Sequence, residues 1–174
     1  PQGNASTGVG IMKKHRTHTT YDILITRCTR SEGLKKTIIP GLSVLPAGIE
    51  LVGAEVELVS VYHREKILKT ALEPYIDLFD YIIIDCPPSM GILSLNAMVA
   101  ADAVLCRLQC EYYALEGLSY LLNSIQTIKN NFNNNLKLFG VVLTMYDKRS
   151  SLCAQLAYMS LVREILAKEN RKVA

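Results

Sequence analysis

The chain has 174 residues, of which 49% are hydrophobic and 20% are charged, and its formal net charge at pH 7 is +3. This length suits a single domain with a buried core, and the composition is typical of a globular protein rather than a disordered one. No apolar run approaches the roughly 20 residues of a membrane span and no signal-peptide pattern is present, so we expect no membrane-spanning helix.

The distribution of charge and cysteine is more informative than the totals. Lys and Arg outnumber Asp and Glu over residues 1–70 and 145–174, whereas residues 71–144 are acidic. The basic ends suit an anionic partner, although charged surface is often simply solvated. The five cysteines are an odd number, which is typical of reduced thiols, and we expect a cytoplasmic protein.

The chain begins with a small, polar segment. Residues 1–10 contain three glycines and are interpreted as a loop that lines a site or as a loose terminus. Because the chain starts with Pro inside this loop and stops without a helix-ending signal, we expect a fragment truncated at both ends. Residues 11–18 include Arg16 and two histidines beside lysines, and we expect them to form an exposed, solvated face rather than a metal site.

Beyond residue 20 the patterns alternate between strand and helix. They predict helices over 21–25, 31–38, 53–76, 94–101, 114–132 and 151–168, and strands over 42–45, 82–84, 103–108 and 138–145. Strands that alternate with helices are typical of βαβ units, so we expect a parallel sheet covered by helices on both faces.

The stretch around Asp85 organises the rest of the chain. Ile82, Ile83 and Ile84 run without a polar break, as in a strand buried on both faces, and Asp85 follows at its carboxyl end. Pro87 and Pro88 follow, and we expect them to keep the backbone after the strand extended. An acid at the carboxyl end of a parallel strand is where α/β folds bind ligands, but it is also an ordinary turn former.

Five stretches of the chain stand out, in this order: Pro1 to Ala5, Gly53 to Leu58, Tyr81 to Ser89, Gln109 to Gly117 and Leu143 to Arg149. In sequence and in order they resemble motifs of the ParA/Soj-type chromosome-partitioning ATPases, which are deviant-Walker P-loop proteins close to the MinD group. The resemblance spans nearly the whole chain, and it implies an α/β fold of the P-loop type. The fold would be a mostly parallel sheet with helices on both faces, present here as one partial domain over residues 1–174.

The resemblance also implies an ATP site with Mg²⁺. Asp85 matches the Walker B acid that orders magnesium and its waters, and Gln2 and Gly3 match a loop that helps to place the attacking water. Glu111 lies in a segment that contacts nucleotide or the partner subunit, and Thr144 ends a strand near the adenine. Each residue has a plainer interpretation as well, since Gln2 could form a turn and Glu111 could simply precede a helix.

Partners follow from the same resemblance. Lys148 and Arg149 match a DNA-binding position, so the implied protein is a homodimer when ATP is bound, sits on non-specific DNA of the nucleoid, and is stimulated by a ParB-type protein. No membrane partner is expected. The plainer interpretation of Lys148 and Arg149 is a pair of solvated charges.

The sequence also departs from the family. No Gly-Lys-Thr occurs in it, so the lysine loop that cradles phosphates is absent from these residues, and we expect them not to hydrolyse ATP alone. Cys106-Arg107 stands where the family usually has an apolar residue and Pro, and Arg107 would point outward at an edge or pair with an acid. Two alternatives stay open: a MinD-type ATPase of the membrane surface, and a non-catalytic remnant that acts only by binding a protein.

Overall fold

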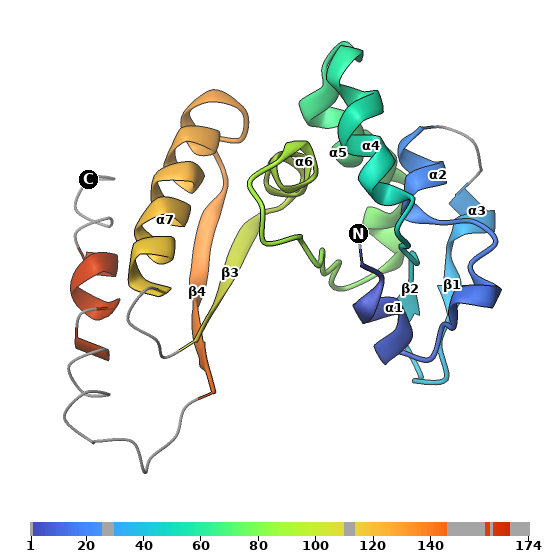
Figure 1. The fold of residues 1–174 in the computed structure, drawn as a ribbon, viewed down its shortest axis with the longest axis horizontal. Helices are drawn as coiled ribbons and strands as arrows, with labels where there is room; N and C mark the ends of the chain where they lie inside the picture. The colour runs from blue at the N-terminus through green and yellow to red at the C-terminus, as the bar shows by residue number, and fades with distance from the viewer. Residues whose placement is uncertain (1, 26–29, 110–113, 146–158, 161, 168–174) are drawn as a thin grey trace. The chain divides into compact units, whose positions relative to one another are not determined.

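The structure is a computed structural model of the chain, and it describes residues 2–25, 30–109, 114–145, 159–160 and 162–167. Two compact units make up the chain, residues 1–101 and residues 102–174. Helices occur in both units and a parallel strand pair occurs in the second (Figure 1), so the predicted α/β class is confirmed. The assignment of residues 1–174 to a single domain stays a prediction.

The first unit consists mainly of short helical elements around a small hairpin. Its helices are α1 (Asn4–Gly8), α2 (Thr20–Leu24), α3 (Arg30–Gly33), α4 (Leu51–Glu57), α5 (Ile67–Leu72) and α6 (Ile92–Ala100), and its strands are β1 (Lys35–Lys36) and β2 (Ser43–Val44). Turns of 3-10 helix are η1 (Lys13–His15), η2 (Leu58–Ser60), η3 (Arg64–Lys66) and η4 (Glu73–Leu78). The core of the unit gathers Leu24, Leu51, Ala54, Leu58 and Leu93, from α2, α4, η2 and α6.

The hairpin corrects two of the sequence predictions. A helix over 31–38 is wrong, because α3 ends at Gly33 and the chain then enters β1. The strand over 42–45 is confirmed at Ser43–Val44, but its expected parallel pairing is wrong, because β2 pairs antiparallel with β1. The cause is the turn between them, in which Leu42 N donates to Ile39 O at 3.1 Å and Gly41 has φ of 77°. Proline followed by a positive-φ glycine is the signature of a type II turn.

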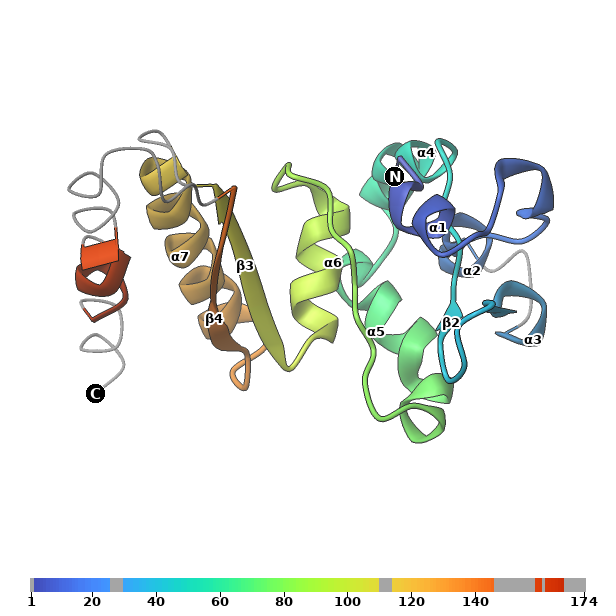
Figure 2. The same ribbon diagram turned by 90° about the horizontal axis from the view of Figure 1, so that it is seen from below.

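The second unit is a parallel strand pair covered by a long helix. β3 (Ala103–Gln109) pairs in parallel with β4 (Lys137–Thr144), and α7 (Ala114–Asn131) lies alongside them (Figure 2). Leu118 and Leu122 of α7 pack against Cys106 and Leu108 of β3. The predicted strands over 103–108 and 138–145 and the helix over 114–132 are confirmed, because their apolar periods match the buried faces.

One face of this strand pair is exposed in the described residues. Leu105 is 58% exposed and Val142 is 45% exposed, although both are apolar. Arg107 is exposed on the same face, which agrees with the prediction that it points outward. Among the described residues, α7 therefore covers one face of β3 and β4 and leaves the other face exposed.

The stretch at Ile82–Ile84 differs most from its prediction. Residues 81–87 form no regular secondary structure, and no strand among the described residues pairs with them, so the predicted buried strand is wrong in this structure. Ile83 is 91% exposed and Tyr81 is 87% exposed. A strand assignment needs hydrogen-bonded neighbours as well as apolar side chains, and only the side chains can be read from the sequence.

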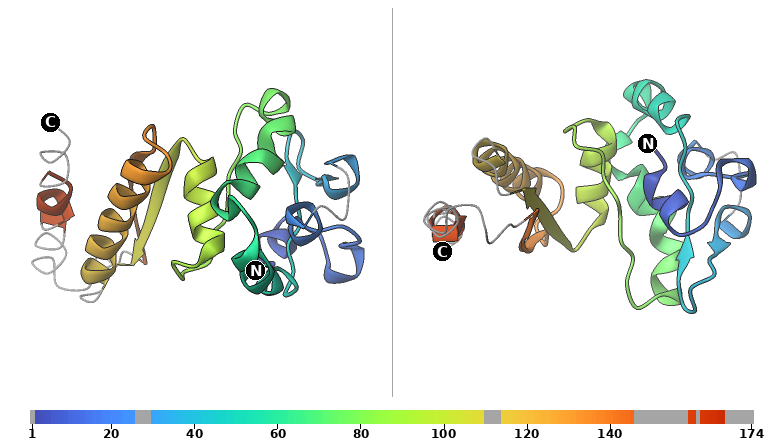
Figure 3. Two further views of the ribbon diagram at one scale, coloured as in Figure 1. Left: turned by 90° about the horizontal axis from the view of Figure 1, so that it is seen from above. Right: turned by 60° about the horizontal axis from the view of Figure 1, so that its bottom comes forward.

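Helix α6 packs against α5 and η3 (Figure 3). Buried Asn96 of α6 hydrogen-bonds to both of these elements. Its Nδ2 donates to Arg64 O at 2.7 Å and to Ile92 O at 2.9 Å, and its Oδ1 accepts from Leu68 N at 3.0 Å. The side chain is 1% exposed, so no water replaces these bonds cheaply.

Asn96→Ala should therefore destabilise the protein by about 1–3 kcal/mol, because it leaves the Leu68 amide and the Arg64 carbonyl without the amide group that satisfies them. Urea denaturation followed by circular dichroism measures this loss. Asn131→Ala is the matched control, since Asn131 is exposed and, in the described part of the chain, its side chain donates only to Thr127 O one turn earlier in α7. This substitution should change the free energy of unfolding by less than about 0.5 kcal/mol. Equal effects of the two substitutions would contradict this role of Asn96.

Gly3 occupies a position that other residues do not fit. Its φ is 71°, and a Cβ added there would overlap Arg16 Nη1 and Ala47 O. Gly10 has φ of 89° but open space around it, whereas Gly8, in α1, has open space and no positive φ. Comparing substitutions at these three glycines therefore distinguishes the cost of a positive φ from the cost of a steric clash.

Gly3→Ala should cost about 1–3 kcal/mol and the most of the three, because it adds a clash to an unfavourable φ. Gly10→Ala should cost about 1–2 kcal/mol from φ alone, and Gly8→Ala should be neutral or slightly stabilising. Urea midpoints of the three variants give the ranking. If Gly3→Ala proves no worse than Gly10→Ala, Arg16 and Ala47 do not crowd Gly3.

Candidate functional site

The first candidate region is the loop that begins at Gln2. Gly3 lies in the left-handed region, and α1 starts at once with Asn4. Asn4 Nδ2 donates to Gln2 Oε1 at 3.0 Å, and Thr7 N donates to Gly3 O at 3.1 Å. The side chain of Gln2 is exposed, so its amide remains accessible to a ligand or a water molecule.

The second candidate region is the segment that carries Asp85. This residue is exposed, and it precedes Pro87 and Pro88, which disfavour helical backbone in the residue before each of them. The turn after them is anchored, because the buried hydroxyl of Ser94 in α6 hydrogen-bonds Ser89 O. Helix α6 is the predicted buried helix over 94–101, and it holds the chain directly after Asp85 in place.

The pKa of the Cys86 thiol is affected by burial and by the charge of Asp85. The residue as a whole is exposed, but its thiol is desolvated, and this raises the pKa of Cys86. The negative charge of Asp85 raises the pKa of Cys86 further. Its Sγ lies 3.7 Å from Ile84 O, the carbonyl to which it donates. Cys86 is therefore a neutral thiol at pH 7 and a poor nucleophile.

The structure does not join these two regions directly. Among the described residues, no hydrogen bond or ion pair links Asp85 to Gln2 or Gly3. Thr144 lies in the second unit at the end of β4, half-buried and paired with Gln109, and its hydroxyl donates to Leu108 O at 3.3 Å. Glu111, Lys148 and Arg149 lie outside the described residues.

The carboxylate of Asp85 fits some metal ions and not others. No cluster of three or more His, Cys, Asp or Glu is found within the described part of the chain. A protein cage for zinc or calcium needs such a cluster. Magnesium keeps several of its waters and is commonly bound through one or two carboxylates and substrate phosphates, which a single exposed Asp can supply.

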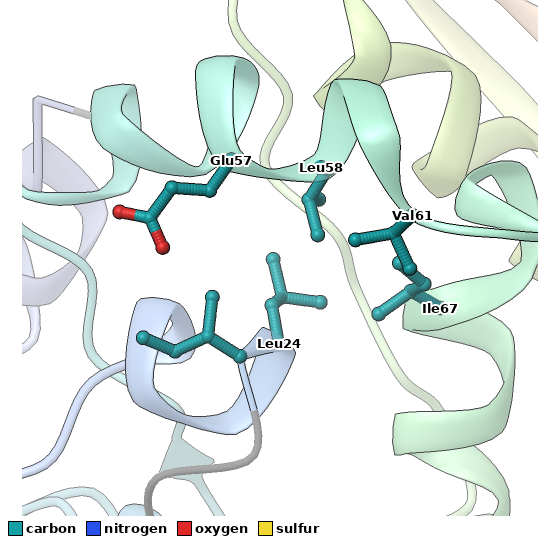
Figure 4. A pocket seen from close by; sticks show the side chains of 6 residues that line it. Leu24, Glu57, Leu58, Val61 and Ile67 are labelled. Atoms are coloured by element: carbon teal, nitrogen blue, oxygen red, sulfur yellow. The ribbon is translucent and has the colours of Figure 1, made fainter.

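A hollow of about 340 Å³ lies elsewhere in the first unit (Figure 4). Leu24, Leu58, Val61 and Ile67 make it apolar, and Glu57 is the acidic group at its edge. The carboxylate of Glu57 already accepts a hydrogen bond from the Tyr21 hydroxyl at 2.7 Å. None of Gln2, Gly3 and Asp85 lines it, and it lacks the converging polar groups of a ligand site.

Sequence reasoning missed Arg16 in this region. The residue is half-buried rather than solvated, so the expectation of an exposed face over 11–18 is wrong for it. Its guanidinium hydrogen-bonds Gly3 O and Ala47 O. Nothing in its sequence neighbourhood signals this, because the bonds reach carbonyl groups that any residue supplies.

The search for membrane spans gives a simple result. Within the described residues, no helix has the length and apolar character that crossing a bilayer requires.

Several known bacterial proteins are similar to the chain over most of its length. The model of a family described as an AAA domain matches residues 1–138. The sporulation initiation inhibitor protein Soj of Bacillus subtilis is 49% identical over 155 residues, which cover 89% of this chain and 61% of that protein. The chromosome partitioning protein ParA of Myxococcus xanthus is 50% identical over 155 residues, covering 89% of this chain and 55% of that one.

A solved structure is similar over nearly the whole chain. Cobyrinic acid a,c-diamide synthase from Mycobacterium smegmatis, with bound ADP and magnesium, has a TM-score of 0.81 and 35% identity, covering 97% of this chain and 64% of that one. The chain therefore spans less than two thirds of the length of these relatives. By the family match and by these identities, the chain belongs to the AAA-domain family of P-loop proteins and is a homologue of the Soj/ParA chromosome-partitioning ATPases.

Proposed function

We propose that the protein to which this chain belongs hydrolyses ATP with Mg²⁺ in order to partition a chromosome or plasmid. The observation that supports this most is the 49–50% identity to Soj and ParA over 89% of the chain. The ADP and magnesium bound to the cobyrinic acid a,c-diamide synthase are consistent with a nucleotide site in this fold.

Asp85 is the residue that we assign to magnesium. It offers an exposed carboxylate, and the prolines after it and the Ser94–Ser89 hydrogen bond hold the following turn. Magnesium, when bound, neutralises charge on the phosphates and holds ordered water. The role of Asp85 is to hold that hydration shell in one orientation.

Gln2 and Gly3 are assigned to the placement of the attacking water. The exposed Gln2 amide carries both a donor and an acceptor, which is the chemistry that orients a water molecule. The Gly3 backbone lets the loop turn directly into α1. Thr144 is assigned to the surroundings of the adenine, and Glu111 to the nucleotide or the partner subunit.

Hydrolysis also needs a phosphate-binding loop. Backbone amides and a lysine of such a loop supply most of the phosphate affinity, and no Gly-Lys-Thr occurs among these 174 residues. We therefore propose that these residues alone do not hydrolyse ATP, and the activity tests below use the protein that carries them together with such a loop.

The proposed partners are a second copy of the protein, non-specific DNA and a ParB-type protein. ATP binding would join two copies, and Lys148 and Arg149 would bind the phosphates of non-specific DNA on the nucleoid in the cytoplasm. A ParB-type protein would stimulate hydrolysis and release. Contacts to phosphates are independent of sequence and weaken as salt rises.

Asp85→Ala should abolish magnesium-dependent ATP turnover, because no described acidic cluster takes over the ion. Phosphate release at saturating ATP and Mg²⁺ measures the rate. Asp80→Ala is the matched control, since Asp80 is an exposed carboxylate in the same segment, and it should turn over normally. A normal rate for Asp85→Ala would remove Asp85 from the site. No turnover in the unsubstituted protein would leave a non-catalytic binding protein as the better hypothesis.

Arg149→Ala should keep ATP binding but lose most of its retention on duplex DNA at low salt. The loss follows from removing a phosphate contact from each copy of a dimer, and it should also reduce the dependence of binding on salt. Arg163→Ala is the matched control, because Arg163 is exposed on the helical stretch at 162–167. Binding assays with ATP and Mg²⁺ at 50 and 200 mM salt would distinguish the variants. Equal retention of both would rule out this role of Arg149.

A further inference from the structure

The guanidinium of Arg16 binds four acceptors from three parts of the first unit. Nη1 donates to Ala47 O at 2.8 Å, and Nε and Nη2 donate to Ile11 O at 3.2 and 3.0 Å. Nη2 also lies 3.1 Å from Gly3 O and 2.7 Å from Thr7 Oγ1, so three acceptors share its two protons. The planar guanidinium therefore binds groups of the protein instead of pointing into solvent.

The bonds of Arg16 are those of a clamp rather than of an ion pair. All four acceptors are neutral, and three of them are backbone carbonyls. No ion pair of Arg16 occurs among the described residues. An arginine that replaces water at carbonyl groups fixes the backbone that carries them.

A second contact ties the same loop to the same place. Ser6 is 3% exposed, and its hydroxyl accepts a hydrogen bond from Ala47 N at 3.1 Å. The Thr7 hydroxyl donates to Gly3 O at 3.2 Å while it accepts from Arg16. Ala47 itself packs against the core of the unit. The loop at residues 3–7 is thus held between Arg16 and Ala47, and Ala47 is itself fixed by its packing against the core.

Gly3 fits this clamp because it lacks a side chain. An added Cβ would overlap both Arg16 Nη1 and Ala47 O, so the guanidinium lies directly on the Gly3 backbone. The φ of 71° turns the Gly3 carbonyl into hydrogen-bond distance of Nη2. Arg16 therefore acts at the residue that joins Gln2 to α1.

We propose that Arg16 is a positioning residue for ATP hydrolysis: by holding the carbonyl of Gly3 against the Ala47 segment, it fixes the loop that presents Gln2. This inference rests on the proposed role of Gln2 and Gly3 above. Arg16 does not touch the nucleotide in it. It sets the geometry of a loop, and small errors of position at a reacting centre reduce the rate strongly.

Arg16→Met tests the proposal in the protein that carries a phosphate-binding loop. Methionine keeps an apolar stem and removes every donor, so kcat should fall by about tenfold or more while KM for ATP changes by less than about twofold. Arg16→Lys should recover part of kcat, because one ammonium cannot reach all the acceptors that the fork reaches. Arg64→Met is the matched control: Arg64 is exposed and, among the described residues, its side chain donates only to Val59 O, so the kcat of this variant should be unchanged.

Hydrogen exchange reports on the loop without any reference to activity. The amides of Thr7, Val9 and Ile11 donate to Gly3 O, Ala5 O and Ser6 O, and they should exchange at least about tenfold faster in Arg16→Met. The amides of Leu95 and Ala101, which bond within and at the end of α6, should keep their rates. Unchanged exchange of the loop amides would overturn the proposal.

Gln2→Ala separates a failure of this proposal from a failure of the proposed function. If Gln2→Ala is slow while Arg16→Met has a loosened loop and a normal kcat, the role of Arg16 is overturned and the role of Gln2 stands. If Gln2→Ala has a normal kcat, the proposed role of the loop fails, and with it the role of Arg16 in hydrolysis. A parallel fall of kcat in both variants, with partial recovery in Arg16→Lys, supports both.

Discussion

The segment Pro46-Ala47 is the fixed point on which the candidate loop depends. Pro46 O accepts from the amide of Thr20, at 2.7 Å, at the start of α2. Ala47 binds Ser6 through its amide and Arg16 through its carbonyl, and its methyl group packs against the core of the first unit. Two peptide units thus connect a helix, a loop and a core, so the position of Gln2 and Gly3 depends on a segment more than 40 residues away as well as on Gly3 and Ser6 of the loop itself.

How much of the fold can be predicted from the sequence depends on where each element finds its partners. Helix α7 and strand β3 have an apolar period that matches the face they bury, and both are predicted nearly to their ends. The sequence predicts the second strand of the hairpin but not β1, because a two-residue strand has no period that distinguishes it from the end of a helix. The Pro40-Gly41 pair was the available signal, since it specifies a turn and not a helix end.

The stretch before Asp85 shows the limit of pattern reasoning. Three consecutive isoleucines are typical of a strand in a sheet, but the segment has no regular secondary structure in the described residues. Pairing, however, is a property of two segments, and no described strand pairs with this one. Burial of a strand side chain also needs an element packed on its face, and Ile83 is 91% exposed in the described residues.

The candidate site could be predicted to a similar, partial extent. Gln2, Gly3 and Asp85 stand in stretches that resemble a family, so their residue types alone draw attention to them. Arg16 stands among lysines and histidines, and its composition indicates only solvated charge. What distinguishes it is a set of carbonyl groups from residues 3, 11 and 47, which the backbone brings together only after folding. Since every residue carries a carbonyl, a clamp of this kind leaves no sequence pattern, and it has to be found from the hydrogen bonds themselves.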